Sequence, residues 1–228
     1  MNKKISEDYG REFFTREGNL KDIDFLVEAV INAEKGHRHV VPYCALFNIT
    51  EVELQEVLKK IFMENVPGFD FSAANFMIAE YNGSPVAAYA GWIEGIAGMP
   101  SRLLKMSAFR SFLSKDHIAW YESIAHIDGE ILIKRDNLTL QLETTYVREN
   151  YRGKGLVALL TDALFKKVKY THPEIVRAQV QLFKENKAAF LSQSKLGFVI
   201  VEEKKSANPE MLKYMPGMTK IKMEKIIS

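Results

Sequence analysis

The sequence predicts an α/β fold, because stretches with a helical spacing of apolar residues alternate with strand-like stretches. Three observations carry this expectation. Helix-start signatures at 19–22 and 50–53 each precede an apolar run with helical spacing. An Asn-Gly pair at 82–83 separates two strand-like runs. A strand-like stretch over 138–147 leads through a glycine turn into an amphipathic helix.

Composition and charge restrict the class of protein. The 228 residues carry a formal net charge of +2, which gives no argument for nucleic acid as a partner. The single cysteine, Cys44, excludes an internal disulfide and a cysteine-rich metal site, and it favours a reducing compartment. We find no apolar core of a signal peptide and no stretch near the roughly 20 apolar residues of a spanning helix. We therefore expect a cytoplasmic protein of one domain, residues 1–228, with no metal and no membrane partner.

The first half of the chain is expected to hold two helices and then an antiparallel strand pair. Asn19-x-x-Asp22 resembles a capping box and precedes apolar residues at helical spacing. Thr50-x-x-Glu53 begins the second helix, whose apolar face carries Leu54, Val57, Leu58, Ile61 and Phe62. Strands over 76–81 and 86–93 flank Asn82-Gly83, which predicts a hairpin.

Residues 94–137 form a segment of a different character. Two glycines and Pro100 interrupt the chain, and a helical pattern then begins at Ser101. A weakly patterned stretch follows, and a short apolar run, 131–133, comes near the end. Because the segment is long for a connection between strands, it predicts an inserted lid, an interface, part of an acceptor pocket, or structural padding.

The second half is expected to alternate strands and helices. In a regular strand over 138–147, one face carries Leu138, Leu140, Leu142, Thr144 and Tyr146, and the other carries Thr139, Gln141, Glu143, Thr145 and Val147. A helix begins at Leu156, and a strand follows at about 176–183. A further helix runs from Asn186 to a glycine cap at Gly197, and the last strands cover 198–201 and 220–227.

The turn within residues 147–158, Val-Arg-Glu-Asn-Tyr-Arg-Gly-Lys-Gly-Leu-Val-Ala, is the most informative segment. Gly153 and Gly155 let the backbone curl so that successive N–H groups point outward. The start of the next helix adds unpaired amides and the positive end of its dipole. Such a loop suits a phosphate or pyrophosphate. The structural alternative is a turn that merely joins a strand to a helix.

Two familiar phosphate loops fit this turn poorly. Residues 153–158 formally match the dinucleotide fingerprint G-x-G-x-x-[GA]. That fingerprint normally opens a domain and needs an acidic residue at the end of the next strand, whereas Glu174 precedes the strand. A Walker loop is excluded, because no Gly-Lys-[Ser/Thr] is present.

Two motifs resemble signatures of the GNAT acetyltransferase superfamily. The acyl-CoA signature, [Gln/Arg]-x-x-Gly-x-[Gly/Ala] after a strand ending in Val, is similar to Arg152-Gly-Lys-Gly155-Leu-Val157 after Val147. The Asn-x-x-Ala…Gly-Phe signature is similar to Asn186-Lys-Ala-Ala189 followed by Gly197-Phe198. The resemblance spans most of the chain and implies a mixed, mostly antiparallel central sheet flanked by helices (an α/β, or α+β, fold). Residues 94–137 then form a helical insertion between the third and fourth strands.

The resemblance also implies a reaction, the transfer of an acetyl group from acetyl-CoA as cosubstrate to a primary amine. The Val147 N–H is then the donor to the oxyanion of the tetrahedral intermediate. Pantetheine lies along the Val147 end of its strand, and the pyrophosphate lies on the glycine turn. The positions implied to bind the cosubstrate are Tyr146, Val147, Arg152, Gly153, Lys154, Gly155, Leu156, Val157, Asn186 and Phe190.

Two side chains are predicted to take part in the chemistry. Glu143 is the candidate general base, with its pKa raised toward neutrality by burial, and a structural ion pair is the alternative. The family's frequent general-acid tyrosine is replaced by Gln193, which has the option of a hydrogen bond to the sulfur. Ser192 or an ordered water is the alternative donor. Val157 is a second departure, since the signature has a small residue there.

Other candidates have plain structural explanations. His37 and His39 are candidates to line an acceptor site or are exposed loop residues, and His117 and His126 do not suggest a metal site. Trp92, Trp120 and Tyr121 either stack on a ligand or pack in the core.

The sequence leaves the acceptor open between small amines, aminoglycoside-like compounds and protein amines. A binding module that holds acyl-CoA without turnover is one alternative function, and an acyltransferase for longer acyl-CoA is another. The apolar pattern of the insertion is compatible with a homodimer.

Overall fold

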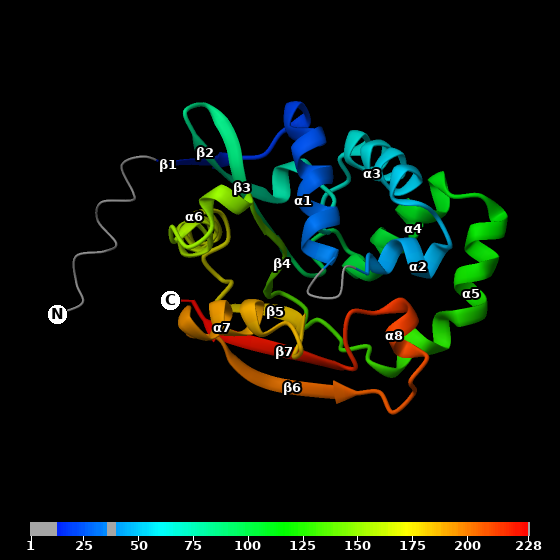
Figure 1. Cartoon of the computed structure of the whole chain (residues 1–228). Coiled ribbons are helices and arrows are strands. Elements are labelled where there is room, and N and C mark those ends of the chain that lie inside the picture. The colour runs from blue at the N-terminus through cyan, green and yellow to red at the C-terminus, as the bar shows by residue number, and fades with distance from the viewer. Residues whose placement is uncertain (1–12, 36–39, 228) are drawn as a thin grey trace.

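The computed structural model describes residues 13–35 and 40–227, and a seven-stranded sheet runs through the molecule (Figure 1). The strand order is β1-β2-β3-β4-β5-β7-β6. Neighbouring strands are antiparallel except β4 and β5, which are parallel. The strands are β1 Phe13–Glu17, β2 Phe76–Tyr81, β3 Ser84–Ile93, β4 Leu140–Val147, β5 Arg177–Phe183, β6 Val199–Lys205 and β7 Thr219–Ile226. The predicted mixed, mostly antiparallel sheet is confirmed.

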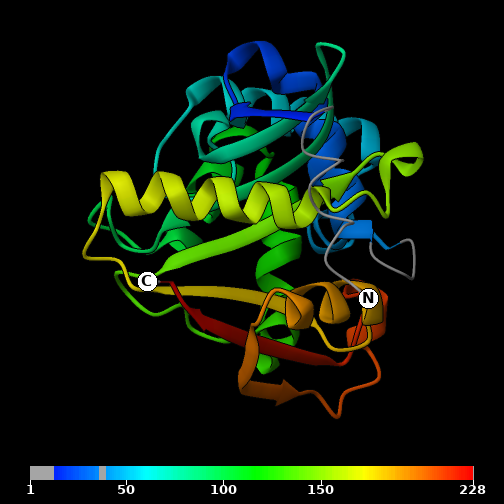
Figure 2. The ribbon, with the colours of Figure 1, turned by 90° about the vertical axis from the view of Figure 1, so that its left-hand side faces the viewer.

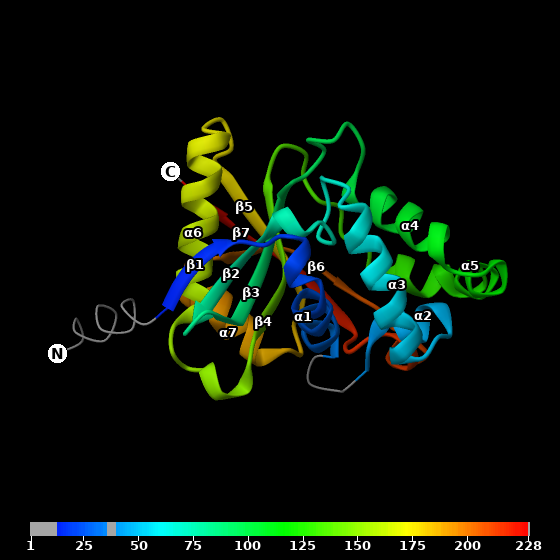
Figure 3. The ribbon, with the colours of Figure 1, turned by 90° about the horizontal axis from the view of Figure 1, so that it is seen from above.

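Helices cover both faces of the sheet (Figure 3). α6 and α7 lie on one face, and α1 to α5 lie on the other. The short α8 contacts α2. The helices are α1 Ile23–Lys35, α2 Pro42–Phe47, α3 Glu51–Glu64, α4 Ser101–Phe112, α5 Lys115–Glu130, α6 Leu156–Thr171, α7 Lys187–Lys195 and α8 Met211–Tyr214. α4 and α5 fall between β3 and β4, which confirms the predicted helical insertion.

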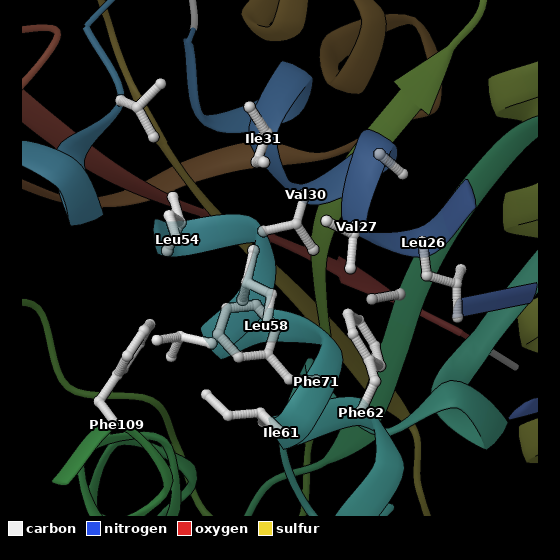
Figure 4. Packing of buried hydrophobic residues seen from close by; sticks show 14 of the residues in the cluster. Leu26, Val27, Val30, Ile31, Leu54, Leu58, Ile61, Phe62, Phe71 and Phe109 are labelled. Atoms are coloured by element: carbon white, nitrogen blue, oxygen red, sulfur yellow. The ribbon is translucent and has the colours of Figure 1, made fainter. Parts of the chain in front are cut away.

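The sheet separates two apolar cores. The larger core joins the buried faces of α1 and α3 to Phe71 and to Phe109 of α4, whose side chains point toward one another in Figure 4. The other core lies under α6. Strand β2 contributes side chains to both cores, because successive side chains of a strand point to opposite faces. Phe76 and Ile78 lie in the larger core, and Met77 and Ala79 lie in the core under α6.

Several predicted elements are confirmed by their local hydrogen bonds. Both capping boxes form, at Asn19–Asp22 before α1 and at Thr50–Glu53 before α3. Asn82 and Gly83 join β2 to β3 with φ angles of 50° and 74°. These positive values are typical of the two-residue hairpin turn predicted from an Asn-Gly pair.

Four elements were not predicted, and each buries few side chains. Only Phe13 is buried in β1, so its alternation is weak. Helix α5 buries only Ile124 and Ile127 over 16 residues. α2 and α8 have six and four residues, too short for a periodic signal. Within residues 13–35 and 40–227, none of the helices combines the length and apolar character that a bilayer crossing requires.

The expected side-chain alternation along β4 is wrong beyond Glu143. Thr144 has a φ of 54°, and the β3–β4 register shifts there, so the strand contains a β-bulge. The extra residue reverses the faces that follow. Tyr146 therefore packs beside α1 and donates to Glu28 Oε1 at 2.8 Å, whereas Val147 joins the core under α6. The strand also starts at Leu140, because Leu138 has a φ of 52°.

Candidate functional site

The glycine turn before α6 presents backbone donors without partners. Gly153 and Gly155 have φ angles of 75° and 77°, and a Cβ on either would meet no atom within 4 Å. Gly155 caps α6 without any side-chain hydrogen bond. In the described part of the chain, no group accepts a hydrogen bond from the N–H of Gly153, Lys154 or Gly155. The turn and the helix dipole thus form a concave donor surface that suits an anion.

Beside this turn, β4 and β5 separate. They pair only from Leu140–Ala178 to Leu142–Val180, and Figure 2 shows the green β4 and the gold β5 diverging beyond that point. The Arg148 N–H donates to Val86 O on β3 at 2.9 Å. Because backbone donors alternate sides along a strand, the Val147 N–H points the other way, into the gap. Arg152 Nε donates to Val147 O at 3.2 Å, so the predicted turn and strand end lie together.

A pocket of about 400 Å³ opens at this gap and continues to the opposite face of the sheet. Residues of α7 line one part, among them Asn186 at its start and Gln193. Residues of α1, α2 and the insertion line the other part. The insertion contributes Arg102, Lys105, Phe109, Tyr121, Asp128 and Arg135. The insertion therefore forms a wall of this pocket.

Glu143 lies in this pocket, bound by cations from the insertion. Its carboxylate accepts from the Arg135 guanidinium, and Lys105 Nζ is 3.6 Å from Glu143 Oε2. Burial alone would raise the pKa of this carboxyl, but the nearby cations, Arg135 first, lower the pKa to about 2. The expected rise of this pKa toward neutrality is wrong. The sequence pattern did not show that two basic side chains of the insertion reach β4.

Lys105 also binds a second acidic residue. Its Nζ donates to Asp70 Oδ2 at 2.8 Å and to the Tyr43 hydroxyl at 3.2 Å. Asp70 is fully buried, and burial raises the pKa of its carboxyl. The pocket floor is thus an ionic network that joins β4, α4 and the segment before β2.

Glu34, near the end of α1, is a site residue that the sequence reasoning missed. Its half-buried side chain lines the same pocket, and within the described residues it makes no hydrogen bond or ion pair. Burial raises the pKa of this carboxyl from 4.5 to about 7. No sequence signal marked it, because a glutamate in the last turn of an amphipathic helix usually faces solvent.

Helix α7 positions Asn186, predicted to bind the cosubstrate, and Gln193, predicted to contact the sulfur. The Asn186 side chain caps the helix by accepting from the Ala189 N–H at 3.1 Å. Gln193 is buried, and its Nε2 donates to the Tyr89 hydroxyl of β3 at 3.0 Å. Its Oε1 has no hydrogen-bond partner among the described residues. Phe190 packs against the core under α6.

The remaining candidates are the histidines and the tryptophans. His37 and His39 fall outside the described residues. His117 and His126 lie on α5, and the described part of the chain holds no group of three His, Cys, Asp or Glu side chains arranged for a metal ion. Trp92 is buried and donates to Glu94, and the Trp120 Nε1 donates to Ala45 O.

Comparison with solved structures matches this architecture over nearly the whole chain. An N-acetyltransferase from Staphylococcus aureus superposes with a TM-score of 0.61 at 11% identity, covering 93% of this chain and 100% of the other. An acetyltransferase of the GNAT family from Streptococcus pneumoniae gives 0.51 at 18%, covering 95% and 100%. The chain has the GNAT fold.

A third GNAT-fold structure, yncA from Salmonella typhimurium solved with its cofactor acetyl-CoA, gives a TM-score of 0.51 at 12% identity. It covers 95% of each chain. No protein-family model and no curated protein sequence matches the chain. At these identities the similarity establishes the GNAT fold alone.

Proposed function

We propose that the protein is an N-acetyltransferase that transfers an acetyl group from acetyl-CoA to a primary amine. One observation supports this function above the others. A helix start without a side-chain cap, an unpaired strand edge and the mouth of the pocket come together where β4 and β5 separate. The helix start suits an anion, the strand edge suits an extended linker, and the pocket suits a small acceptor.

The residues at the gap fit coenzyme A. The amides of residues 153–157 and the Arg152 side chain would hold the pyrophosphate, and the Val147 N–H would face the acyl end. Tyr146 would take part through its backbone only, because its hydroxyl is bound to Glu28. When bound, acetyl-CoA supplies an activated thioester. The Val147 N–H would stabilise the negative charge that develops on the acetyl oxygen, typically worth a few kcal/mol.

The acceptor amine must lose a proton during the reaction. In the proposed step its nitrogen forms a bond to the acetyl carbon and the carbon–sulfur bond breaks. Coenzyme A leaves as the thiolate, which then takes up the second proton that the nitrogen loses as the amide forms. The proton from the ammonium goes to a carboxylate in the pocket. We assign this base to Glu34, because a pKa near 7 suits proton transfer at neutral pH. Glu143, with a pKa of about 2, would bind a proton too weakly.

The leaving group needs little help. A thiol has a pKa of about 8.5, so a thiolate departs with less protonation than an alkoxide. Gln193 would contact the sulfur region, oriented by the Tyr89 hydroxyl. Tyr89 itself is fully buried, and burial raises its pKa to about 12, so it remains protonated.

Calorimetry and thiol release test the proposal. We expect the wild-type protein to bind coenzyme A and to release free thiol from acetyl-CoA only when an amine is added. Binding without turnover on any amine would indicate the non-catalytic module instead. Faster turnover with longer acyl groups would indicate the second alternative, a longer-chain acyltransferase. No affinity for coenzyme A would refute all three.

Two variants identify the base. Glu34→Gln should lower kcat/KM at pH 7 by about 100-fold and remove the limb of the pH profile near pH 7. If that limb persists in Glu34→Gln and disappears in Glu143→Gln, the base is Glu143, as the sequence predicted.

We also propose a cytoplasmic location, a single domain over the whole chain and a homodimer, each first inferred from the sequence. Size-exclusion chromatography with light scattering would test the dimer.

A further inference from the structure

Two ionisable side chains that line the pocket, Glu34 and Lys220, form no ion pair within the described residues. Three of the pocket's cations are paired: Arg102 with Asp128 at 2.8 Å, Arg135 with Glu143, and Lys105 with Asp70. The fourth cation, Lys220 at the start of β7, makes no ion pair and no side-chain hydrogen bond within residues 13–35 and 40–227. Glu34 is the corresponding carboxylate without a partner.

Lys220 is well placed for a ligand rather than for solvent. Its side chain lines the pocket and is half-buried, and β7 pairs it with Phe183, the last residue of β5. Burial lowers the pKa of this ammonium more than the attraction of Glu143 and Asp128 raises it, so on balance the surroundings disfavour the charge. A buried charge is costly unless it is paired, so an anionic group of a bound molecule would stabilise it.

The apolar wall of the same pocket restricts the kind of ligand that can contact both Glu34 and Lys220. Phe47 packs against Phe109 at 4.7 Å and against Tyr121 at 5.2 Å between ring centroids. All three rings line the pocket, and Leu46 lies beside them. This wall suits an apolar side chain and offers it no hydrogen-bond partner apart from the Tyr121 hydroxyl.

We infer that the acceptor is an amino acid with an apolar side chain, whose carboxylate binds Lys220 and whose amine faces Glu34. This inference rests on the proposed acetyltransferase function and names its substrate class. The acceptor's ammonium gives one proton to Glu34, and its nitrogen then bonds to the acetyl carbon as the carbon–sulfur bond breaks. The second nitrogen proton goes to the departing sulfur, so the products are the N-acetylamino acid and coenzyme A as the thiol. The carboxylate takes no part in the bond changes and serves recognition alone.

Matched substrate pairs test the inference on the wild-type protein. Leucine is compared with 3-methylbutylamine, and phenylalanine with 2-phenylethylamine, by thiol release and by mass spectrometry of the product. We expect kcat/KM to favour the amino acid by about 10-fold or more, since a charge-assisted contact is lost without the carboxylate. Equal or better turnover of the amines would overturn the inference while leaving the proposed function intact. No turnover of any amine would overturn the proposed function and this inference with it.

Variants of Lys220 test the assigned contact. Lys220→Met keeps the length of the side chain and removes its charge, and it should reduce the preference for leucine to within about threefold. Lys220→Arg should retain most of the preference for leucine over 3-methylbutylamine. Lys60→Met, on the exposed face of α3, is the matched control and should keep the wild-type ratio. An unchanged ratio in Lys220→Met would overturn the assignment.

A binding measurement gives an answer that does not depend on turnover. N-acetylleucine keeps the carboxylate, and N-(3-methylbutyl)acetamide lacks it. Calorimetry should show about 10-fold tighter binding of N-acetylleucine to the wild-type protein and no such difference for Lys220→Met. Equal binding of the two products by the wild-type protein would contradict the inference. Unchanged affinity of Lys220→Met for coenzyme A would confirm that the variant is folded.

Discussion

Replacing Glu34 by Gln should stabilise the protein relative to wild type, and this difference in the free energy of unfolding should grow as the pH rises. The carboxyl of Glu34 has a pKa of about 7 in the folded protein and 4.5 as the ordinary value. The folded state therefore binds this proton more tightly than the unfolded chain does, and stability is lost as the pH rises from about 4.5 to about 7. Glutamine carries no such charge, so the variant avoids the loss.

The size of the effect follows from the shift in pKa. A shift of one unit corresponds to about 1.4 kcal/mol, so the ionised carboxylate costs about 3 kcal/mol of unfolding free energy at pH 8. At pH 5 the same group costs only about 1 kcal/mol, because it is largely protonated in the folded state. The stability gained by Glu34→Gln should thus grow by about 2 kcal/mol between these two pH values.

Urea unfolding at pH 5 and pH 8, followed by circular dichroism, measures this growth. Glu56→Gln, on the exposed face of α3, is the control and should show no comparable dependence on pH. The assignment of a desolvated carboxyl at position 34 predicts that the difference in unfolding free energy between Glu34→Gln and wild type grows with pH. A difference that stays constant, or shrinks as the pH rises, would refute it. The kinetic role of Glu34 would then lose its physical basis.

Three further predictions concern the same region. Gly155→Ala should weaken coenzyme A binding by calorimetry and lower stability by about 1 kcal/mol, since φ is positive there; Gly83→Ala, with similar φ, should lower stability alone. Glu143→Gln should destabilise the protein by about 3 kcal/mol at neutral pH because Arg135 loses its counter-ion. That penalty should shrink below pH 4.5 as the wild-type carboxyl protonates, since its folded pKa is depressed to about 2, and an effect that rises in acid would contradict it. Asn186→Ala removes a helix cap and should cost about 1 kcal/mol in urea unfolding; no change would indicate that α7 begins without it.

Local chemistry was predictable from the sequence. The capping boxes, the Asn82-Gly83 hairpin and the glycine turn before α6 all depend on a few adjacent residues, and the structure contains each of them. The β4–β5 gap had no local residue pattern, and the resemblance to a family implied only that pantetheine lies along the Val147 end of its strand.

Long-range placement was not predictable. The bulge at Thr144 depends on how β4 pairs with β3, so the alternation expected for a regular strand assigned Tyr146 to the wrong face. The environment of Glu143 depends on Arg135 and Lys105, which come from a segment whose position the sequence pattern did not reveal. Glu34 lay in an ordinary helical context, and only the folded pocket gives its carboxyl an unusual pKa.

The ionic floor of the pocket makes residues 94–137 indispensable to the rest of the molecule. Both basic partners of Glu143 belong to that segment, and Lys105 is also the counter-ion of the fully buried Asp70. A version without this segment would leave Glu143 and Asp70 without their basic partners. We therefore expect a shorter homologue without α4 and α5 to carry neutral residues at both acidic positions, so that loss of the extra helices and loss of these charges occur together.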